Sequence, residues 1–338
     1  MTEARTERRG ADIPRGRVTA ADGLLVVDKA QGWTSHDVVA RTRRLAATKK
    51  VGHAGTLDPM ATGVLVLGVG RATRLLTYLV GADKEYTATV RLGQATVTDD
   101  AEGDVVDQPG AEPLLRADGT AGTAAIESAL AGLRGPIEQV PSAVSAIKVD
   151  GKRAYARVRQ GEDVALPARP VTIHRLELTA PPRAAVVGET AVLDLDVVVG
   201  CSSGTYVRAL ARDLGAALGT GGHLTALRRT RVGPFTLDGA RTVAELVAEV
   251  AAQAEEPEPT GLRTTTMTEA ATACFPVRHL DADQTAAVRV GKFLDPTAQL
   301  GSGADEAVTA ALAPDGHVVA LLGDRDGQAR PILVLDPA

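Results

Sequence analysis

Apolar runs and alternating apolar and polar positions predict several strands along the chain. Leu24–Asp28 and Val64–Val69 are short apolar runs, typical of strands buried in a core. In Tyr86–Leu92 and in Leu193–Val199, apolar residues alternate with polar ones, which predicts strands with one buried face. Cys201–Gly204 interrupts the last of these patterns and marks the end of that strand.

Two segments instead show helical spacing. Thr34 and Asp37 are three residues apart and resemble a capping box, and Val38 and Leu45 then fall on one face. Apolar residues at helical spacing predict a second helix over 207–218. Because helices and strands mix without regular alternation, the pattern predicts an α+β fold and not a doubly wound sheet.

Changes in composition along the 338 residues predict two domains. Residues 1–22 are polar and unpatterned, which predicts a disordered tail. The segment 253–266 is rich in Glu and Pro and is interpreted as a linker. It would separate a main domain, residues 23–252, from a small β-rich domain over residues 267–338.

The composition argues against membrane, secreted, disulfide-rich and zinc-binding proteins. Hydrophobic residues make up 44% of the chain, enough for a sizeable core, and no apolar run reaches the length of a membrane span. The N-terminus lacks the apolar stretch of a secretory signal. Two cysteines provide neither a disulfide framework nor zinc-site spacing. We therefore expect a soluble, cytoplasmic protein with no metal.

The net charge of −5 is unevenly distributed. Residues 251–338 contain 13 acidic and 6 basic side chains, whereas residues 1–250 are slightly basic. Basic runs occur at 41–50 and at 228–231. Such runs are usually solvated faces, but they leave nucleic acid open as a partner.

The segment Gly52–Gly63 has the most unusual composition. Three glycines and Pro59 predict tight, irregular backbone between two apolar elements. Asp58 in such a loop is compatible with a nucleophile, a base, a metal ligand or an ordinary turn residue. His53 is equally compatible with a hydrogen-bonded loop residue. No second carboxylate lies at metal-ligand spacing, so the residues by themselves do not favour a metal site.

This segment resembles the signature loop of the TruB family, the bacterial tRNA pseudouridine-55 synthases. Four further segments resemble family motifs in the same order. They are Gly23–Lys29 with Gly32–Ser35, Asp83–Tyr86, Pro141–Ser142 with Tyr155–Arg157, and Gly204–Arg208 with Leu227–Thr230. The resemblance spans residues 23–231. It implies a pseudouridine-synthase fold with a mixed, mostly antiparallel sheet, an RNA-gripping insertion at about 141–170 and a PUA-like C-terminal domain.

The resemblance also implies a reaction and its residues. Uridine-55 in the T-arm loop of tRNA would be flipped out and isomerised to pseudouridine without a cofactor. Asp58 takes the position of the nucleophile, and Arg208 that of its counter-ion. Tyr86 takes the position of the tyrosine that stacks on the base, with a role in proton transfer at C5. A desolvated carboxylate needs such a cation if it is to stay ionised.

Other positions match residues that contact RNA in this family. His53 would stack into the RNA, Tyr206 would shape the pocket, and Leu227 would line it. Lys29, Arg74 and Lys84 match basic positions near the RNA, where phosphate neutralisation supplies affinity. The chain departs from the family pattern at Ala30, usually proline, and at Val144, usually tyrosine.

The implied partner is the tRNA T-arm, with no membrane and no obligatory protein partner. A non-catalytic tRNA-folding chaperone that uses the same surface is the main alternative. An unrelated hydrolase with an aspartate nucleophile is a third hypothesis. It would need a general acid or a metal ion beside the aspartate, and the sequence does not show one. The combination of Asp58, Tyr86 and Arg208 favours the enzyme over both.

Overall fold

The computed structural model describes residues 13–116, 119, 121–142, 148–149, 152–153, 166–296 and 308–338. The strands of its main sheet are β1 (Gly23–Lys29), β2 (Val51–His53), β3 (Thr62–Val69), β4 (Lys84–Leu92), β7 (Gly135–Gln139), β10 (Arg169–Leu178), β11 (Arg183–Val187), β12 (Thr190–Cys201), β13 (Gly222–Val232), β14 (Phe235–Thr236) and β15 (Thr265–Thr266). Within the described residues they form one sheet in the order β15-β1-β3-β13-β4-β12-β10-β7. Along this order only β13 and β3 pair in parallel. The predicted mixed, mostly antiparallel α+β fold is confirmed.

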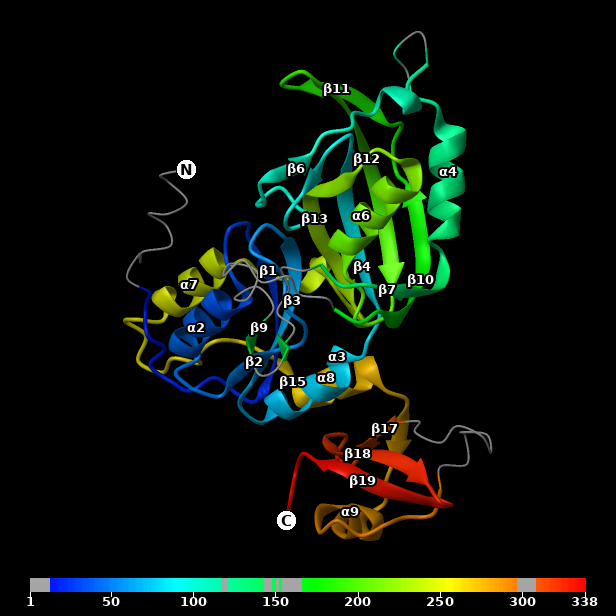
Figure 1. Cartoon of the computed structure of the whole chain (residues 1–338). Helices are drawn as coiled ribbons and strands as arrows, with labels where there is room; N and C mark the ends of the chain where they lie inside the picture. The colour runs from blue at the N-terminus through cyan, green and yellow to red at the C-terminus, as the bar shows by residue number, and fades with distance from the viewer. Residues whose placement is uncertain are drawn as a thin grey trace.

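The helices are α2 (Ser35–Leu45), α3 (Leu76–Val80), α4 (Thr123–Gly132), α6 (Val207–Leu218), α7 (Val243–Ala252), α8 (Met267–Cys274) and α9 (Ala282–Arg289). Four helices, α2, α4, α6 and α7, cover one face of this sheet in two groups, α3 and α8 lie against the other face of β1 and β3, and α9 belongs to the C-terminal domain (Figure 1). α2 and α7 pack together near β1 and β2, whereas α4 and α6 pack near β10 and β13. The capping box at Thr34 and the predicted helix over 207–218 are both confirmed.

The apolar runs of β1 and β3 are explained by burial on both faces. Leu25 and Leu65 pack into the core beneath α2, whereas Leu24 and Val64 point to a second core shared with α8 and the C-terminal domain. A strand that is covered on both sides has no solvent face for polar residues. The continuous apolar pattern of these strands is therefore a direct consequence of their place in the sheet.

β4 and β12 alternate because one of their faces lies away from the helices. Leu195 and Val197 face the core, whereas Asp196 accepts a hydrogen bond from Thr89 at 2.7 Å. Arg91 bonds Asp194 through two nitrogens, each at 2.8 Å. Cross-strand polar pairs thus occupy the face that the helices leave open.

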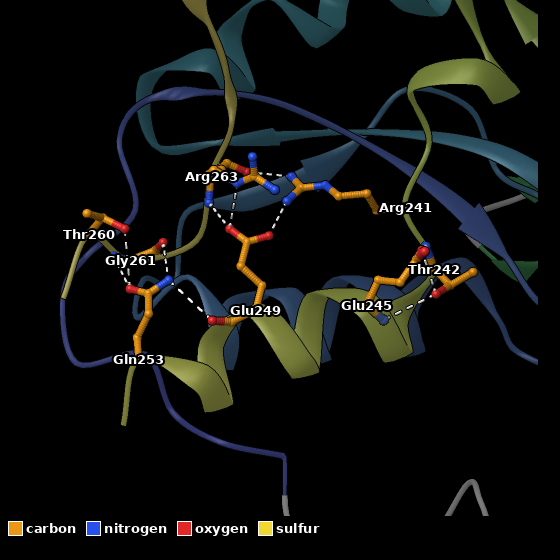
Figure 2. A network of polar contacts seen from close by, with 8 residues as sticks. All are labelled: Arg241, Thr242, Glu245, Glu249, Gln253, Thr260, Gly261 and Arg263. Atoms are coloured by element: carbon orange, nitrogen blue, oxygen red, sulfur yellow. Dashed lines mark hydrogen bonds and ion pairs between the residues drawn. The ribbon is translucent and has the colours of Figure 1, made fainter. Parts of the chain in front are cut away.

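Two segments predicted to be unstructured are ordered against α2 and α7. Residues 13–22, predicted as part of a disordered tail, contact α2 through backbone hydrogen bonds such as Gly16 N–H to Arg44 O. The predicted linker ends in β15 and is tied to α7, where Glu249 bonds Arg263 and Gln253 bonds Gly261 (Figure 2). Hydrogen bonds and the buried side chains of Ala20 and Leu262 hold these segments, although neither segment has the apolar periodicity that predicts order.

The C-terminal residues form a second, four-stranded sheet with α9 at its side. Its strands are β16 (Val277–His279), β17 (Val308–Leu312), β18 (Val318–Arg325) and β19 (Gln328–Val334). This domain meets the main domain where Arg71, Arg74 and Tyr78 donate hydrogen bonds to carbonyls of residues 332–335. None of the described helices combines the length and apolar character needed to cross a membrane.

Candidate active site

The loop that carries Asp58 joins β2 to β3, and donors from distant segments hold its backbone. The carbonyls of Gly55 and Thr56 accept from the guanidinium of Arg229 at 3.1 and 3.4 Å. The hydroxyl of Ser35 donates to Leu57 O at 3.2 Å and accepts from Leu57 N at 2.9 Å. Few of the loop's own residues pair with one another, so its shape depends on these external donors.

The second half of the loop is held in the same way. Pro59 O accepts from the Gly32 amide at 2.7 Å and from the Lys29 ammonium at 3.4 Å. Gly63, which leads into β3, has a φ of +100° and a backbone so close to β13 that a Cβ there would lie 2.2 Å from Arg229 O. Only glycine fits this position without strain. Asp58 therefore sits on backbone that is fixed from both sides.

Asp58 forms an ion pair with Arg208, the second residue of α6. Arg208 Nε lies 3.0 Å from Asp58 Oδ2, and the side chains are 7% and 39% exposed respectively. Arg208 also meets Asp100 Oδ2 at 3.4 Å and donates to Thr98 O at 2.8 Å. Asp100 lies in the turn between β5 (Ala95–Thr96) and β6 (Val105–Asp107), and its side chain is only 5% exposed. One buried guanidinium thus forms ion pairs with two carboxylates.

A cavity of about 310 Å³ opens beside this pair. It is lined by Gly55, Thr56, Leu57, Asp58, Val80, Lys84, Tyr86, Ser203, Gly204, Thr205, Tyr206, Val207, Arg208, Leu227 and Arg229. Tyr86 and Leu227 are buried, each 7% exposed, and form an apolar wall. The cavity combines one ion pair, two further cations, two phenols and apolar side chains, a mixture of apolar walls and a few polar groups that is typical of small-ligand sites.

The two tyrosines of the cavity are neutral hydrogen-bonding groups at physiological pH. Burial raises the pKa of Tyr86, and the charge of Arg229 opposes that effect. Burial also raises the pKa of Tyr206. The backbone of Tyr206 is held by Gln139, whose carboxamide accepts from Tyr206 N at 2.8 Å and donates to Tyr206 O at 3.1 Å. This contact sets the start of α6 and with it the position of Arg208.

The structure brings Asp58, Tyr86, Arg208, Lys84, Tyr206 and Leu227 together around the cavity. Lys29 lies beneath the loop with no exposed surface, and its ammonium bonds three carbonyls, including Trp33 O at 2.7 Å. Burial lowers the pKa of Lys29 to about 8. Lys84 is also buried, on the carbonyls of Val80 and Ala82. Both lysines hold backbone in place, and both side chains are buried.

The remaining predicted contacts lie outside the cavity. Arg74 is exposed and donates to Val334 O of the C-terminal domain at 2.9 Å. His53 forms an edge-to-face contact with the exposed ring of His36, with ring centroids 5.9 Å apart. Burial lowers the pKa of His53. Phosphate contact by Arg74 and stacking by His53 stay predictions. Val144 and Tyr155–Arg157 of the predicted insertion lie outside the described residues.

Sequence reasoning missed three residues of this site: Asp100, Gln139 and Arg229. Arg229 stands in the quoted motif Leu227–Thr230, but nothing in its pattern distinguishes a buried arginine from a surface one. Asp100 is 108 positions from Arg208, so no local spacing connects them. Among the described residues, no three His, Cys, Asp or Glu side chains gather in a way that would hold a metal ion.

Family models match nearly the whole chain from residue 43 onward. The model described as TruB family pseudouridylate synthase (N terminal domain) matches residues 43–207. The model described as tRNA pseudouridylate synthase B C-terminal domain matches residues 208–268. A third, described as tRNA Pseudouridine synthase II, C terminal, matches residues 275–336.

Curated relatives are similar over almost their full length. The tRNA pseudouridine synthase B of Arthrobacter sp. (strain FB24) is 59% identical, covering 94% of this chain and 97% of the relative. The protein of the same name from Nocardia farcinica (strain IFM 10152) is 55% identical, covering 96% of each. Among solved structures, a Cbf5-Nop10-Gar1 complex matches with a TM-score of 0.67 and 26% identity, covering 93% of this chain and 85% of the other.

Proposed function

The chain belongs to the TruB family of pseudouridylate synthases, and from this premise we propose that it isomerises uridine-55 in the T-arm loop of tRNA to pseudouridine, with Asp58 as nucleophile. The observation that carries this proposal is the Asp58–Arg208 pair, 3.0 Å long, at the edge of a cavity with a tyrosine wall. The curated relatives are named as tRNA pseudouridine synthases, which supports tRNA as the substrate.

The reaction breaks one bond and forms another within a single nucleotide. The bond between ribose C1′ and uracil N1 breaks, and its electron pair leaves with the base. The base turns, C5 forms the new bond to C1′, C5 loses its proton, and N1 gains one. Atoms and charge balance without a co-reactant, so the residues must supply only a nucleophile, proton transfer and a site that retains the base.

The proposal gives a part to each of three residues. Asp58 lines the cavity with a side chain that is 39% exposed, and the Arg208 guanidinium, 3.0 Å away, orients its carboxylate. Tyr86 presents a neutral phenol against the face of the base, next to Leu227. The target base must leave its stack to reach them, at a cost of about a few kcal/mol. Attack by Asp58 on ribose C1′ and attack on base C6 both fit this arrangement.

The test is pseudouridine formation on an unmodified tRNA transcript, without added cofactor or metal. We expect pseudouridine at position 55 of the wild-type transcript and none at that position in a transcript with cytidine there. Asp58→Asn should abolish the reaction while tRNA affinity stays within about tenfold, or about 1.4 kcal/mol. Asp107→Asn, at an exposed position of β6, is the matched control and should retain activity.

The same experiment separates the enzyme from a tRNA-folding chaperone. A chaperone would bind tRNA with equal affinity in the wild type and in Asp58→Asn, and would form no pseudouridine in either. Pseudouridine made by carefully purified Asp58→Asn protein would show that Asp58 is not the nucleophile.

A further inference from the structure

Two buried cations line the cavity with only neutral partners. Arg229 is 1% exposed, and its guanidinium donates to the carbonyls of Gly55, Thr56 and Val64. Lys84 is 7% exposed, and its ammonium donates to Val80 O at 2.9 Å and Ala82 O at 2.6 Å. Among the described residues, neither cation has a carboxylate within 4.0 Å. Arg208 differs, because two carboxylates accompany it.

The lining of the cavity therefore carries excess positive charge. Its charged groups are Asp58, Arg208, Lys84 and Arg229. Burial lowers the pKa of Lys84, and the charge of Arg229 adds to that effect, so each cation lies within the field of the other. Leaving charge in a dry site without an opposite charge costs free energy. An arrangement of this kind favours an anion in the cavity.

The reaction supplies such an anion. When the bond between C1′ and N1 breaks, the electron pair stays on uracil and spreads over N1, O2 and O4. Addition of a carboxylate at C6 likewise places negative charge on the ring, at C5 and O4. In both routes the uncharged uracil of the substrate becomes negatively charged only as the reaction proceeds. Fixed cations in a desolvated site stabilise such a state more than they stabilise the substrate.

We propose that Arg229 and Lys84 form an anion-stabilising site that holds the negative charge developing on the uracil ring. This inference rests on the proposed function, because it needs uridine in the cavity. The carbonyls that both cations bond keep them stationary, so little reorganisation is needed when charge appears. In the alternative role, the two cations would bind the phosphate of the flipped nucleotide. They would then increase RNA affinity and leave the rate of the chemical step unchanged.

The test compares uridine with 5-fluorouridine at the target position of an otherwise identical transcript. Fluorine at C5 withdraws electrons and stabilises an anionic ring without help from the protein. The variants are Arg229→Gln and Lys84→Gln, which remove charge but keep amide donors for the carbonyls. Single-turnover loss of the N-linked target nucleoside is measured at saturating RNA, together with RNA affinity and thermal unfolding. Lys29→Gln is the matched control, because Lys29 is a buried, carbonyl-bonded lysine that is not among the cavity-lining residues described.

With uridine, we expect each charge-removing variant to lower the single-turnover rate about 100-fold. With 5-fluorouridine, the loss should shrink to about tenfold or less, because the ring then needs less stabilisation. Lys29→Gln should lower both rates by the same factor. Arg229→Lys and Lys84→Arg, which keep the charge, should recover most of the difference between the two substrates.

Two results would overturn the proposal. Equal losses on both substrates in Lys84→Gln would show that the lysine only supports the fold, and this variant decides the matter if Arg229→Gln does not fold. Weaker binding with a smaller salt dependence, at an unchanged saturating rate, would assign the cations to phosphate. Failure of the proposed function is distinct, since the wild-type protein would then form no pseudouridine.

Discussion

Replacement of Arg208 by Met should expose which carboxylate depends on it for stability. The guanidinium is buried between Asp58 and Asp100, whose side chains are 39% and 5% exposed. Water can solvate Asp58 when its partner is removed, whereas Asp100 is almost fully buried and would keep, among the described residues, only the neutral donors Thr98 Oγ1 and Glu102 N. We therefore expect Arg208→Met to lower the free energy of unfolding by about 3–5 kcal/mol, mostly through the unpaired charge of Asp100.

A double-mutant cycle tests this division. Asp100→Asn alone should cost about 1–2 kcal/mol, because Arg208 keeps Asp58 and Thr98 O as partners. Adding Asp100→Asn to Arg208→Met removes the negative charge that was left buried without a cation. The double variant should therefore be about 2 kcal/mol more stable than Arg208→Met. Activity should not return, because Asp58 still lacks its counter-ion.

The assay is urea unfolding at pH 7 with matched slopes, followed by single-turnover pseudouridine formation under folding conditions. Arg175→Met is the control, because that side chain is 51% exposed and pairs with Glu177, which is 52% exposed. It should cost about 1 kcal/mol or less. If the double variant is no more stable than Arg208→Met, Asp100 is not the carboxylate that needs the guanidinium.

Further predictions concern Lys29, Gly63 and the basic run at residues 41–50. Burial lowers the pKa of Lys29 from 10.5 to about 8, so the unfolded state binds the proton more tightly. The stability of the wild type relative to Lys29→Met should therefore rise by about 2–3 kcal/mol as pH increases from 8 to 10.5, and a flat difference in urea titrations would contradict this. Gly63→Ala should cost about 1–3 kcal/mol in thermal unfolding because of its φ and its close approach to β13, whereas Gly188→Ala, with φ +62° and open space, should cost less. tRNA affinity should fall with added salt, and replacing exposed Lys49 and Lys50 by Ala should flatten that dependence by about one unit of slope for each RNA phosphate that the variant no longer neutralises.

Short-range patterns were enough to predict the principal elements around the site. The apolar runs at β1 and β3, the alternation in β4 and β12, and the spacing of α6 depend on residues at most a few positions apart, so they can be read locally. The loop of Asp58 stood out by its glycines and proline. The resemblance to a known family then connected Asp58, Tyr86 and Arg208, which the structure places around one cavity.

Tertiary structure alone decided how the charges are arranged. Lys29, Lys84 and Arg229 have ordinary sequence neighbours, yet all three are buried on carbonyls that the fold brings to them. Asp100 reaches Arg208 only because the turn after β5 lies against α6. Burial and pairing depend on segments far apart in the chain, and the free energy of a charge depends on both. For this reason the sequence by itself determined the elements and the signature residues of this protein, whereas the electrostatics of its candidate active site came from the assembled fold.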